Sequence, residues 1–222
     1  MKIDLTYTEE NYLKAIYHIG ENDSDDVSTN SLSESMNTKP ATVSDMIKRL
    51  SKKKVVRYEK YKGVQLTDLG RQLALQIIRK HRLWEVFLVD KLRFNWDEVH
   101  DIAEQLEHIK SPLLVRRLDD FLGNPKIDPH GDPIPDEQGQ FHIGPTLEMD
   151  KLEAGDQCVF VGVSDSDPRL LQYLDKIKIH LGLKFQILEK VEFDNSMEVC
   201  SDQHESIFLS QQVTSQLSVR KI

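Results

Sequence analysis

The chain has 222 residues, of which 30% are charged and 39% hydrophobic, and it carries a net charge of −8. No apolar run reaches 18 residues and the first residues lack the apolar core of a signal peptide, so we expect neither a membrane-spanning helix nor a secretion signal. Cys158 and Cys200 form no CxxC pair, which argues against a disulfide framework and predicts reduced cysteines in a cytoplasmic protein.

The first 66 residues predict a winged helix-turn-helix. Thr8 is a plausible N-cap of a first helix, 28–36 reads as a short helix, and Pro40 opens a third helix. Residues 55–66 then read as two strands around a turn that closes at Gly63. In this arrangement the second helix of the pair enters the major groove and the hairpin lies along the DNA backbone.

The charge distribution favours DNA as a partner despite the negative total. Residues 37–62 hold nine basic and two acidic residues, whereas 118–156 hold ten acidic and two basic ones. Such asymmetry predicts that one half of the chain meets a polyanion, although a basic helix can also be only a solvated surface. The candidates for phosphate contacts are Lys39, Thr42, Ser44, Lys48, Lys60 and Lys62, and those for base edges are Asp45 and Ser44.

Three further helices follow in the sequence pattern. Thr67 caps a helix that runs to about Leu92 with Gly70 as its one weak point, and helices are predicted over 95–109 and from 111 to Gly123. The first and last of these carry more apolar surface than one small domain needs. This excess predicts a homodimer, although packing within the chain would give a similar pattern.

A stripe of metal-ligand residues is the most informative local feature. In a helix over 95–109, His100, Glu104, Glu107 and His108 fall within one face about 100° wide. His81 and Glu85 repeat the i, i+4 spacing in the preceding helix. Imidazole and carboxylate without thiolate suit Mn(II), Fe(II), Co(II) or Zn(II). The alternative is that these residues form ordinary solvated helix surface.

The last third predicts a small β-barrel. Residues 125–145 are rich in Pro, Gly and Asp and read as a long connection. Short β-like runs separated by turns then follow at 157–163, 185–191, 197–200 and 206–209, with one helix over 167–178.

These motifs together resemble the diphtheria-toxin-repressor family of metal-dependent repressors, in its manganese-sensing, three-domain branch. The segments that carry the resemblance span nearly the whole chain: 61–63, 66–70, 79–85, 98–108, 115–119, 122–125, 129–131 and 134–135. The resemblance implies a mainly α fold with β structure. It comprises a winged helix-turn-helix over 1–72, a helical metal-binding and dimerisation domain with linker over 73–144, and a small SH3-like (FeoA-like) barrel over 145–222. It also implies a repressor of metal-uptake genes that binds a palindromic operator as a homodimer.

The resemblance further implies two sets of metal ligands. Glu104, Glu107 and His108 match the primary, activating site, where Asn11 stands in place of an Asp of manganese sensors. The residues that match the ancillary site are His81, Glu85, His100, Asp128, His130 and Asp165. Iron-sensing members have Cys at the position of Glu104, so the carboxylate favours Mn(II), with an Fe(II)-responsive repressor as the alternative. A neutral Asn11 implies weaker or altered metal binding, and Glu10, about 100° round the helix, is not expected to replace it.

Two other functions are compatible with parts of this pattern. A metal-dependent hydrolase could use the same His and Glu residues, but the chain has no HExxH motif, nucleophile elbow or Gly-rich phosphate loop, so we do not expect an enzyme. A winged-helix regulator could instead sense an organic ligand, with the His and Glu residues purely structural. We expect no organic cofactor and no membrane partner.

Overall fold

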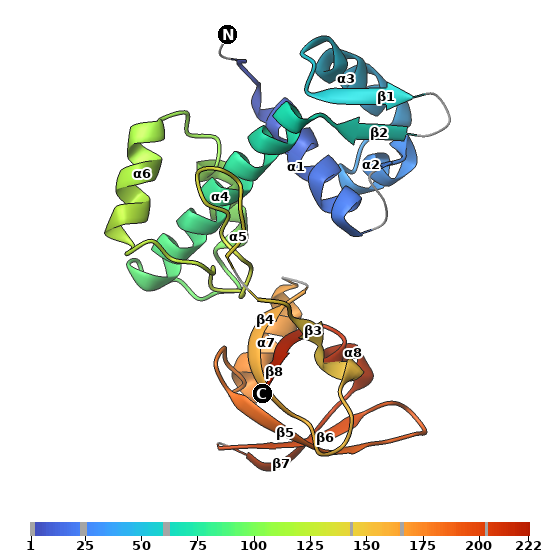
Figure 1. Ribbon diagram of the computed structural model, residues 1–222, viewed down its shortest axis with the longest axis vertical. Coiled ribbons are helices and arrows are strands. Elements are labelled where there is room, and N and C mark those ends of the chain that lie inside the picture. The colour runs from blue at the N-terminus through green and yellow to red at the C-terminus, as the bar shows by residue number, and fades with distance from the viewer. Residues whose placement is uncertain (1–2, 23–25, 60–62, 143, 165–166, 203) are drawn as a thin grey trace. The chain divides into compact units, whose positions relative to one another are not determined.

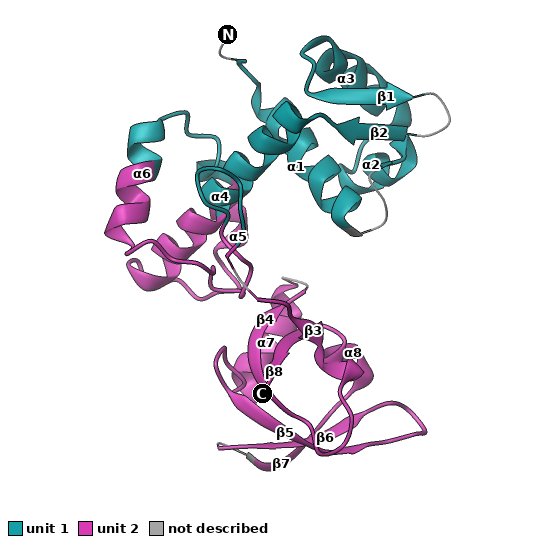
Figure 2. Ribbon diagram, viewed as in Figure 1, with its two compact units in different colours: residues 1–81, 105–115, 135–141 teal, residues 82–104, 116–134, 142–222 magenta. Residues whose placement is uncertain are grey.

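The computed structural model describes residues 3–22, 26–59, 63–142, 144–164, 167–202 and 204–222 (Figure 1). They form two compact units (Figure 2). Unit 1 comprises 1–81, 105–115 and 135–141, and unit 2 comprises 82–104, 116–134 and 142–222. Within the described ranges, no helix is both long and apolar enough to cross a membrane.

Unit 1 contains the predicted winged helix-turn-helix. Its elements are α1 (Tyr7–Asn22), α2 (Thr29–Ser35), α3 (Pro40–Lys52), β1 (Val56–Glu59) and β2 (Gly63–Leu66). The two strands pair antiparallel from Val56↔Leu66 to Glu59↔Gly63, and Val64 also bridges Val27 ahead of α2. Leu13, Leu32 and Leu50, one from each helix, are fully buried in one core. The order helix, helix, helix, hairpin confirms the prediction for this part of the chain.

Side-chain caps explain where these helices begin. Ser28 accepts a hydrogen bond from the Ser31 amide at the start of α2, and Pro40 opens α3. The first helix begins at Tyr7, and its cap is Thr6, two residues before the predicted Thr8 cap. Thr6 and Glu9 exchange backbone-to-side-chain hydrogen bonds of 3.3 and 2.8 Å, which is a capping box.

Helix α4 (Asp68–Asp90) begins where only glycine fits. A Cβ on Gly70 would stand 1.9 Å from the carbonyl oxygen of Val55, so the residue that looked like a weak point permits close packing on the wing. Thr67 caps this helix as predicted, since its hydroxyl accepts a hydrogen bond from the Gly70 amide.

The predicted helix over 95–109 is much shorter in the structure. Helix α5 spans only His100–Leu106, so the expectation that Glu107 and His108 share its face is wrong. The Ile109 amide bonds to the Leu106 carbonyl three residues back, which tightens the chain into a turn. Helix α6 (Pro112–Phe121) follows, and Gly123 ends it with φ +80°.

The C-terminal part of unit 2 is a six-stranded antiparallel sheet with order β3-β8-β4-β5-β6-β7. The strands are β3 (Leu147–Glu148), β4 (Gln157–Val163), β5 (Lys184–Lys190), β6 (Met197–Ser201), β7 (His204–Leu209) and β8 (Leu217–Lys221). The helical segments are η1 (Met149–Lys151), α7 (Pro168–Lys176) and α8 (Gln211–Thr214). Strand β8 was not expected from the sequence, yet it pairs with both β3 and β4.

Within unit 2, this sheet domain contacts Trp96, which also packs against its apolar core, and the loop that carries His130. Trp96 donates a hydrogen bond of 3.0 Å to Asp175 of α7, and the Val163 amide of β4 donates to the His130 carbonyl at 2.8 Å. Gly131 has φ +92°, and a Cβ there would stand 2.0 Å from the carbonyl oxygen of Val161. The loop that carries His130 is therefore fixed directly against β4.

Candidate metal centre

Glu107 is the centre of a buried polar cluster in unit 1. Its side chain is fully buried, and its Oε2 atom lies 2.6 Å from His81 Nδ1 and 2.8 Å from Lys14 Nζ. Its Oε1 atom has no hydrogen-bond partner among the described residues and lies 3.8 Å from His108 Nε2. The carboxylate is therefore held by one oxygen, and the other oxygen lies near the imidazole of His108.

His108 is oriented by Glu10 of α1. The Nδ1 atom of His108 lies 2.6 Å from Glu10 Oε2, and the Tyr7 ring lies 4.1 Å from the imidazole. An ionised carboxylate only accepts hydrogen bonds, so Nδ1 carries the proton and Nε2 keeps its lone pair. A carboxylate on one ring nitrogen is how metal-binding histidines are commonly held.

Asn11 supplies the second buried oxygen without a partner. Its Oδ1 atom is inaccessible to solvent and makes no hydrogen bond among the described residues, as for Glu107 Oε1. Each such atom costs about 1–3 kcal/mol when left unsatisfied. Two buried oxygens without partners and one imidazole lone pair are donors that suit a divalent cation of middling hardness, so the residues fit the metal that the resemblance implies.

Nearby positive charges shape the electrostatics of this cluster. Burial by itself would raise the pKa of Glu107, but the hydrogen bond with His81 and the charge of Lys14 outweigh it and hold that pKa below its ordinary value. Burial lowers the pKa of Lys80, and the charges of Glu10 and Glu107 oppose that shift. Two carboxylates therefore share this interior with two lysines.

Unit 2 contains a second cluster around Glu85. Its Oε1 atom lies 3.5 Å from His100 Nδ1 and its Oε2 atom 3.6 Å from His130 Nδ1. Ligand-type atoms of Glu85, Asp128 and His130 all lie within 4.8 Å of one another, and all three residues are buried. This cluster unites four of the six residues that the sequence assigned to an ancillary site.

Neighbouring groups hold the side chains of both Asp128 and His130 in place. Asp128 Oδ1 accepts hydrogen bonds from the amides of His130 and Asp132, and its Oδ2 lies 3.6 Å from Arg82. Burial would lower the pKa of His130, but its hydrogen bond with Glu85 and the charges of Glu85 and Asp128 raise it. The carboxylates thus favour a positive charge at this position.

The remaining predicted ligands lie in different surroundings. Glu104 is 46% exposed, and its Oε1 atom is 3.7 Å from His100 Nε2. His81 lies one turn before Glu85 on α4, and its Nδ1 atom contacts Glu107, which the sequence assigned to the other site. Asp165 lies outside the described residues. Sequence reasoning missed Glu10 and Lys14 as parts of the cluster, although the i, i+4 spacing of two charges beside apolar Leu13 could have indicated them.

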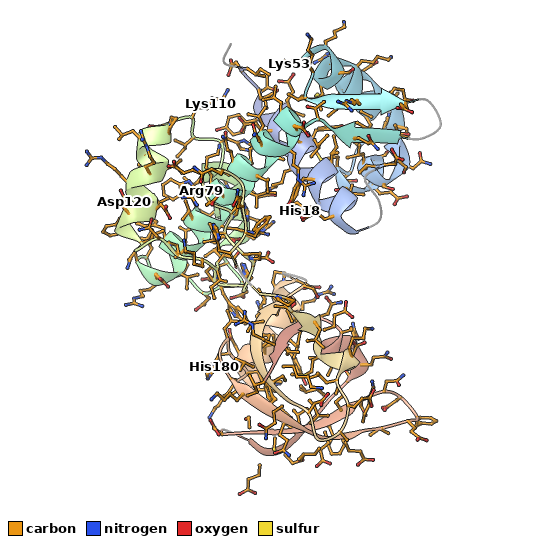
Figure 3. The ribbon with its side chains drawn as sticks, viewed as in Figure 1. His18, Lys53, Arg79, Lys110, Asp120 and His180 are labelled. Carbon is orange, nitrogen blue, oxygen red and sulfur yellow. The ribbon has the colours of Figure 1, made fainter. Side chains whose placement is uncertain are left out.

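Helix α1 also contacts the end of α3. Lys53, the C-cap residue of α3, lies 2.8 Å from Glu9 Oε2 and donates to the Asp4 carbonyl. Lys110 holds the same N-terminal segment through Asp4 Oδ1 and the Leu5 carbonyl, and Figure 3 labels both lysines. Three consecutive residues of α1 therefore have different surroundings. Glu9 pairs with Lys53 at the end of α3, Glu10 pairs with His108, and the side-chain oxygen of Asn11 is buried.

The candidate DNA surface lies on α3 and its N-terminus. Lys39, Thr42, Asp45 and Lys48 are exposed there. Asp45 pairs with Lys48 at 3.1 Å, and the Ser44 hydroxyl donates to the Pro40 carbonyl, so both predicted base-reading residues have internal partners. Lys60 and Lys62 lie outside the described residues.

A winged helix-turn-helix with a buried carboxylate–imidazole cluster defines the class of metal-responsive DNA-binding regulators. Known families agree with this class along most of the chain. Residues 4–64 match the iron-dependent repressor N-terminal DNA-binding domain, 67–136 the iron-dependent repressor metal-binding and dimerisation domain, and 147–221 the FeoA domain.

Individual relatives cover different parts of the chain. The iron-dependent repressor IdeR of Mycobacterium tuberculosis is 36% identical over 132 residues, which is 60% of this chain and 57% of IdeR. The match therefore spans little more than half of that relative. The diphtheria toxin repressor of Corynebacterium glutamicum is 29% identical over 90% of this chain and 86% of its own length.

A solved manganese-dependent transcriptional repressor in complex with manganese covers more. It is 37% identical, with a TM-score of 0.86 over 96% of this chain and all of the other. The chain belongs to the diphtheria-toxin-repressor family of metal-dependent transcriptional repressors, which are regulators and not enzymes.

Proposed function

We propose that this protein is a Mn(II)-activated transcriptional repressor of metal-uptake genes that binds a palindromic operator as a homodimer. The observations that carry the proposal are two buried oxygens without hydrogen-bond partners in the described chain. Glu107 Oε1 lies 3.8 Å from His108 Nε2, and Asn11 Oδ1 belongs to the residue that follows Glu10, the partner of His108. One of them lies on a helix of the DNA-binding fold and the other in the turn after α5. A bound divalent cation would supply positive charge that joins these two segments.

The primary site in this proposal comprises Asn11, Glu104, Glu107 and His108. Glu10 holds His108 through Nδ1, while His81 and Lys14 hold Glu107 through Oε2. The ancillary site comprises Glu85, His100, Asp128 and His130, with His81 and Asp165 as further candidates. We keep the division into domains at 1–72, 73–144 and 145–222 as part of the same proposal, supported by the three separate family matches.

The donor set supports Mn(II) over softer ions. Carboxylate, amide oxygen and imidazole make up the primary site, and no thiolate is among its proposed ligands. Mn(II) binds soft sulfur poorly and accepts such oxygen-rich sites, as do Fe(II) and, with different geometry, Zn(II). Similarity to the repressor solved with manganese favours Mn(II). Similarity to the iron-dependent repressor IdeR makes an iron-responsive repressor the competing proposal.

Helix α1 connects metal binding to DNA binding in this proposal. A cation held by Asn11 and His108 would stabilise one position of α1. The Glu9–Lys53 ion pair would then hold the end of α3 in a matching position. The ion can shift the equilibrium only by its differential affinity for the DNA-competent state. Two α3 helices with one fixed separation would then match the two half-sites of an operator.

Exposed apolar side chains support the homodimer. Leu113, Leu114 and Phe121 on α6 are 57%, 40% and 64% exposed, a surface that a second copy would cover. A regulator that binds chromosomal DNA works in the cytoplasm, where we place this protein.

Metal dependence of DNA binding tests the proposal. We expect the protein to retard promoter DNA of metal-uptake genes in Mn(II) and to release it in excess chelator, because the two half-sites are matched only when the ion is bound. Parallel gel-shift titrations with Mn(II), Fe(II), Zn(II) and chelator measure this. Equal retardation in Mn(II) and chelator would refute the proposal, and a response to Fe(II) alone would assign the iron-sensing function.

The basic surface of α3 has its own test. Lys39→Ala should weaken binding to operator and to random DNA alike and reduce the salt dependence by about one counterion, because a lysine on phosphate carries no sequence information. Fluorescence anisotropy at several salt concentrations measures both quantities. Lys184→Ala, at the exposed first residue of β5, is the control. An unchanged salt slope with lost sequence preference would instead place Lys39 against a base.

A further inference from the structure

Lys14 stands out because it contacts the proposed metal centre without being a metal ligand. Its Nζ atom lies 2.8 Å from Glu107 Oε2, and its side chain is only 14% exposed. A fully buried carboxylate needs such a partner, since an unpaired buried charge strongly destabilises the fold. We propose that Lys14 is a tethered counter-ion of Glu107 that weakens metal binding and thereby sets the metal concentration at which the repressor responds.

One oxygen of Glu107 is available to a cation, but the positive partner of the other oxygen makes cation binding less favourable. Lys14 and His81 both use Oε2 of Glu107, whereas Oε1 has no hydrogen-bond partner within the described chain. An ion at Oε1 would share one carboxylate with a fixed ammonium, and like charges that close repel.

The chemistry of α1 strengthens this effect. Asn11 is neutral, so the carboxylates of the primary site lie in the 104–108 segment alone, and Lys14 offsets part of their charge. The inference rests on the proposed function, since it concerns the affinity of that same site. The competing explanation is that the Lys14–Glu107 pair only stabilises the fold.

One substitution that removes the charge of Lys14 and one that keeps it separate the two explanations. Lys14→Gln keeps a hydrogen-bond donor for Oε2 but removes the charge, so we expect about tenfold tighter Mn(II) binding and a lower melting temperature in chelator. Lys14→Arg keeps the charge and should retain the wild-type affinity within about threefold. The readouts are calorimetric titration of the full-length protein with Mn(II) and thermal unfolding in chelator.

Lys151→Met provides the control for loss of a lysine. Lys151 forms an exposed ion pair with Glu148 in the sheet domain, so both readouts should be unchanged. If Lys14→Gln binds Mn(II) no more tightly than wild type, the inference is wrong while the proposed function stands. If neither protein binds Mn(II), the proposed function fails and the inference with it. Should Lys14→Gln be too unstable to purify, Lys14→Met removes the same charge with a side chain of similar length, and an affinity no tighter than wild type would again refute the inference.

Discussion

Replacing Glu107 by Gln is expected to abolish metal-activated DNA binding. The substitution keeps the size of the side chain and an oxygen for Lys14 and His81, but it removes the charge from the one fully buried carboxylate of the cluster. Loss of groups that only support a metal ligand costs 10–100-fold in affinity, so loss of the ligand charge itself should cost about 100-fold or more. We therefore expect no retardation of operator DNA at Mn(II) concentrations that saturate the wild type.

Calorimetric Mn(II) titration and gel shifts on one preparation measure both effects. Circular dichroism shows whether Glu107→Gln retains the fold, and Glu192→Gln, which removes an exposed carboxylate in the C-terminal domain, controls for net charge. If Glu107→Gln folds and still responds to Mn(II) as the wild type does, Glu107 is not a ligand and the buried cluster has another role.

Asn11→Asp should have the largest effect in the opposite direction. The Asn11 oxygen is buried and unpartnered within the described chain, which speaks against the alternative that it only caps the start of α1. A charged oxygen there should tighten Mn(II) binding by about 1–3 kcal/mol, or about 5- to 150-fold, once desolvation is counted. Less Mn(II) should then be needed for half-maximal DNA binding.

The same substitution should destabilise the metal-free protein slightly, because a new carboxylate would stand on α1 beside Glu10. Mn(II) titrations of the two proteins, with thermal unfolding in chelator, test both expectations. Asn30→Asp, on the exposed surface of α2, is the matched control. Identical Mn(II) affinities for Asn11→Asp and wild type would mean that the site is built without Asn11.

Periodicity and turn chemistry determined the winged helix-turn-helix from sequence alone. Apolar spacing located α1 to α4. Ser28 and Thr67 marked helix starts through local hydrogen bonds, and Pro40 marked the start of α3 through its fixed φ angle. Such signals depend on residues within one turn of each other, so they can be read directly from the sequence. The exceptions are also local: the capping box of Thr6 and Glu9 was overlooked, and so was β8, whose alternation rests on only two apolar residues, Leu217 and Val219.

The candidate ligands were also found from sequence. Glu85, His100, Asp128 and His130 of the ancillary set lie together as expected, but the helical stripe of the other set was wrong. Spacing placed His100, Glu104, Glu107 and His108 on one helix, whereas α5 ends at Leu106 and the last two residues lie in a turn. Assignment of His81 to the ancillary set rested on its spacing from Glu85 and on the resemblance. Its contact with Glu107 joins residues 26 positions apart in the chain, and no helical period encodes that distance.

The partners of the proposed metal ligands Glu107 and His108 were determined by the tertiary structure alone. In the sequence, Glu10 appeared to face the wrong way on its helix and Lys14 was an unremarkable charge. In the fold, Glu10 holds His108 across 98 residues and Lys14 holds Glu107 across 93. A sequence gives the chemistry of each side chain and the face of its own helix. Whether a buried carboxylate meets an imidazole, a lysine or an incoming ion depends on the packing of segments distant in sequence, and that packing sets the electrostatics of the site.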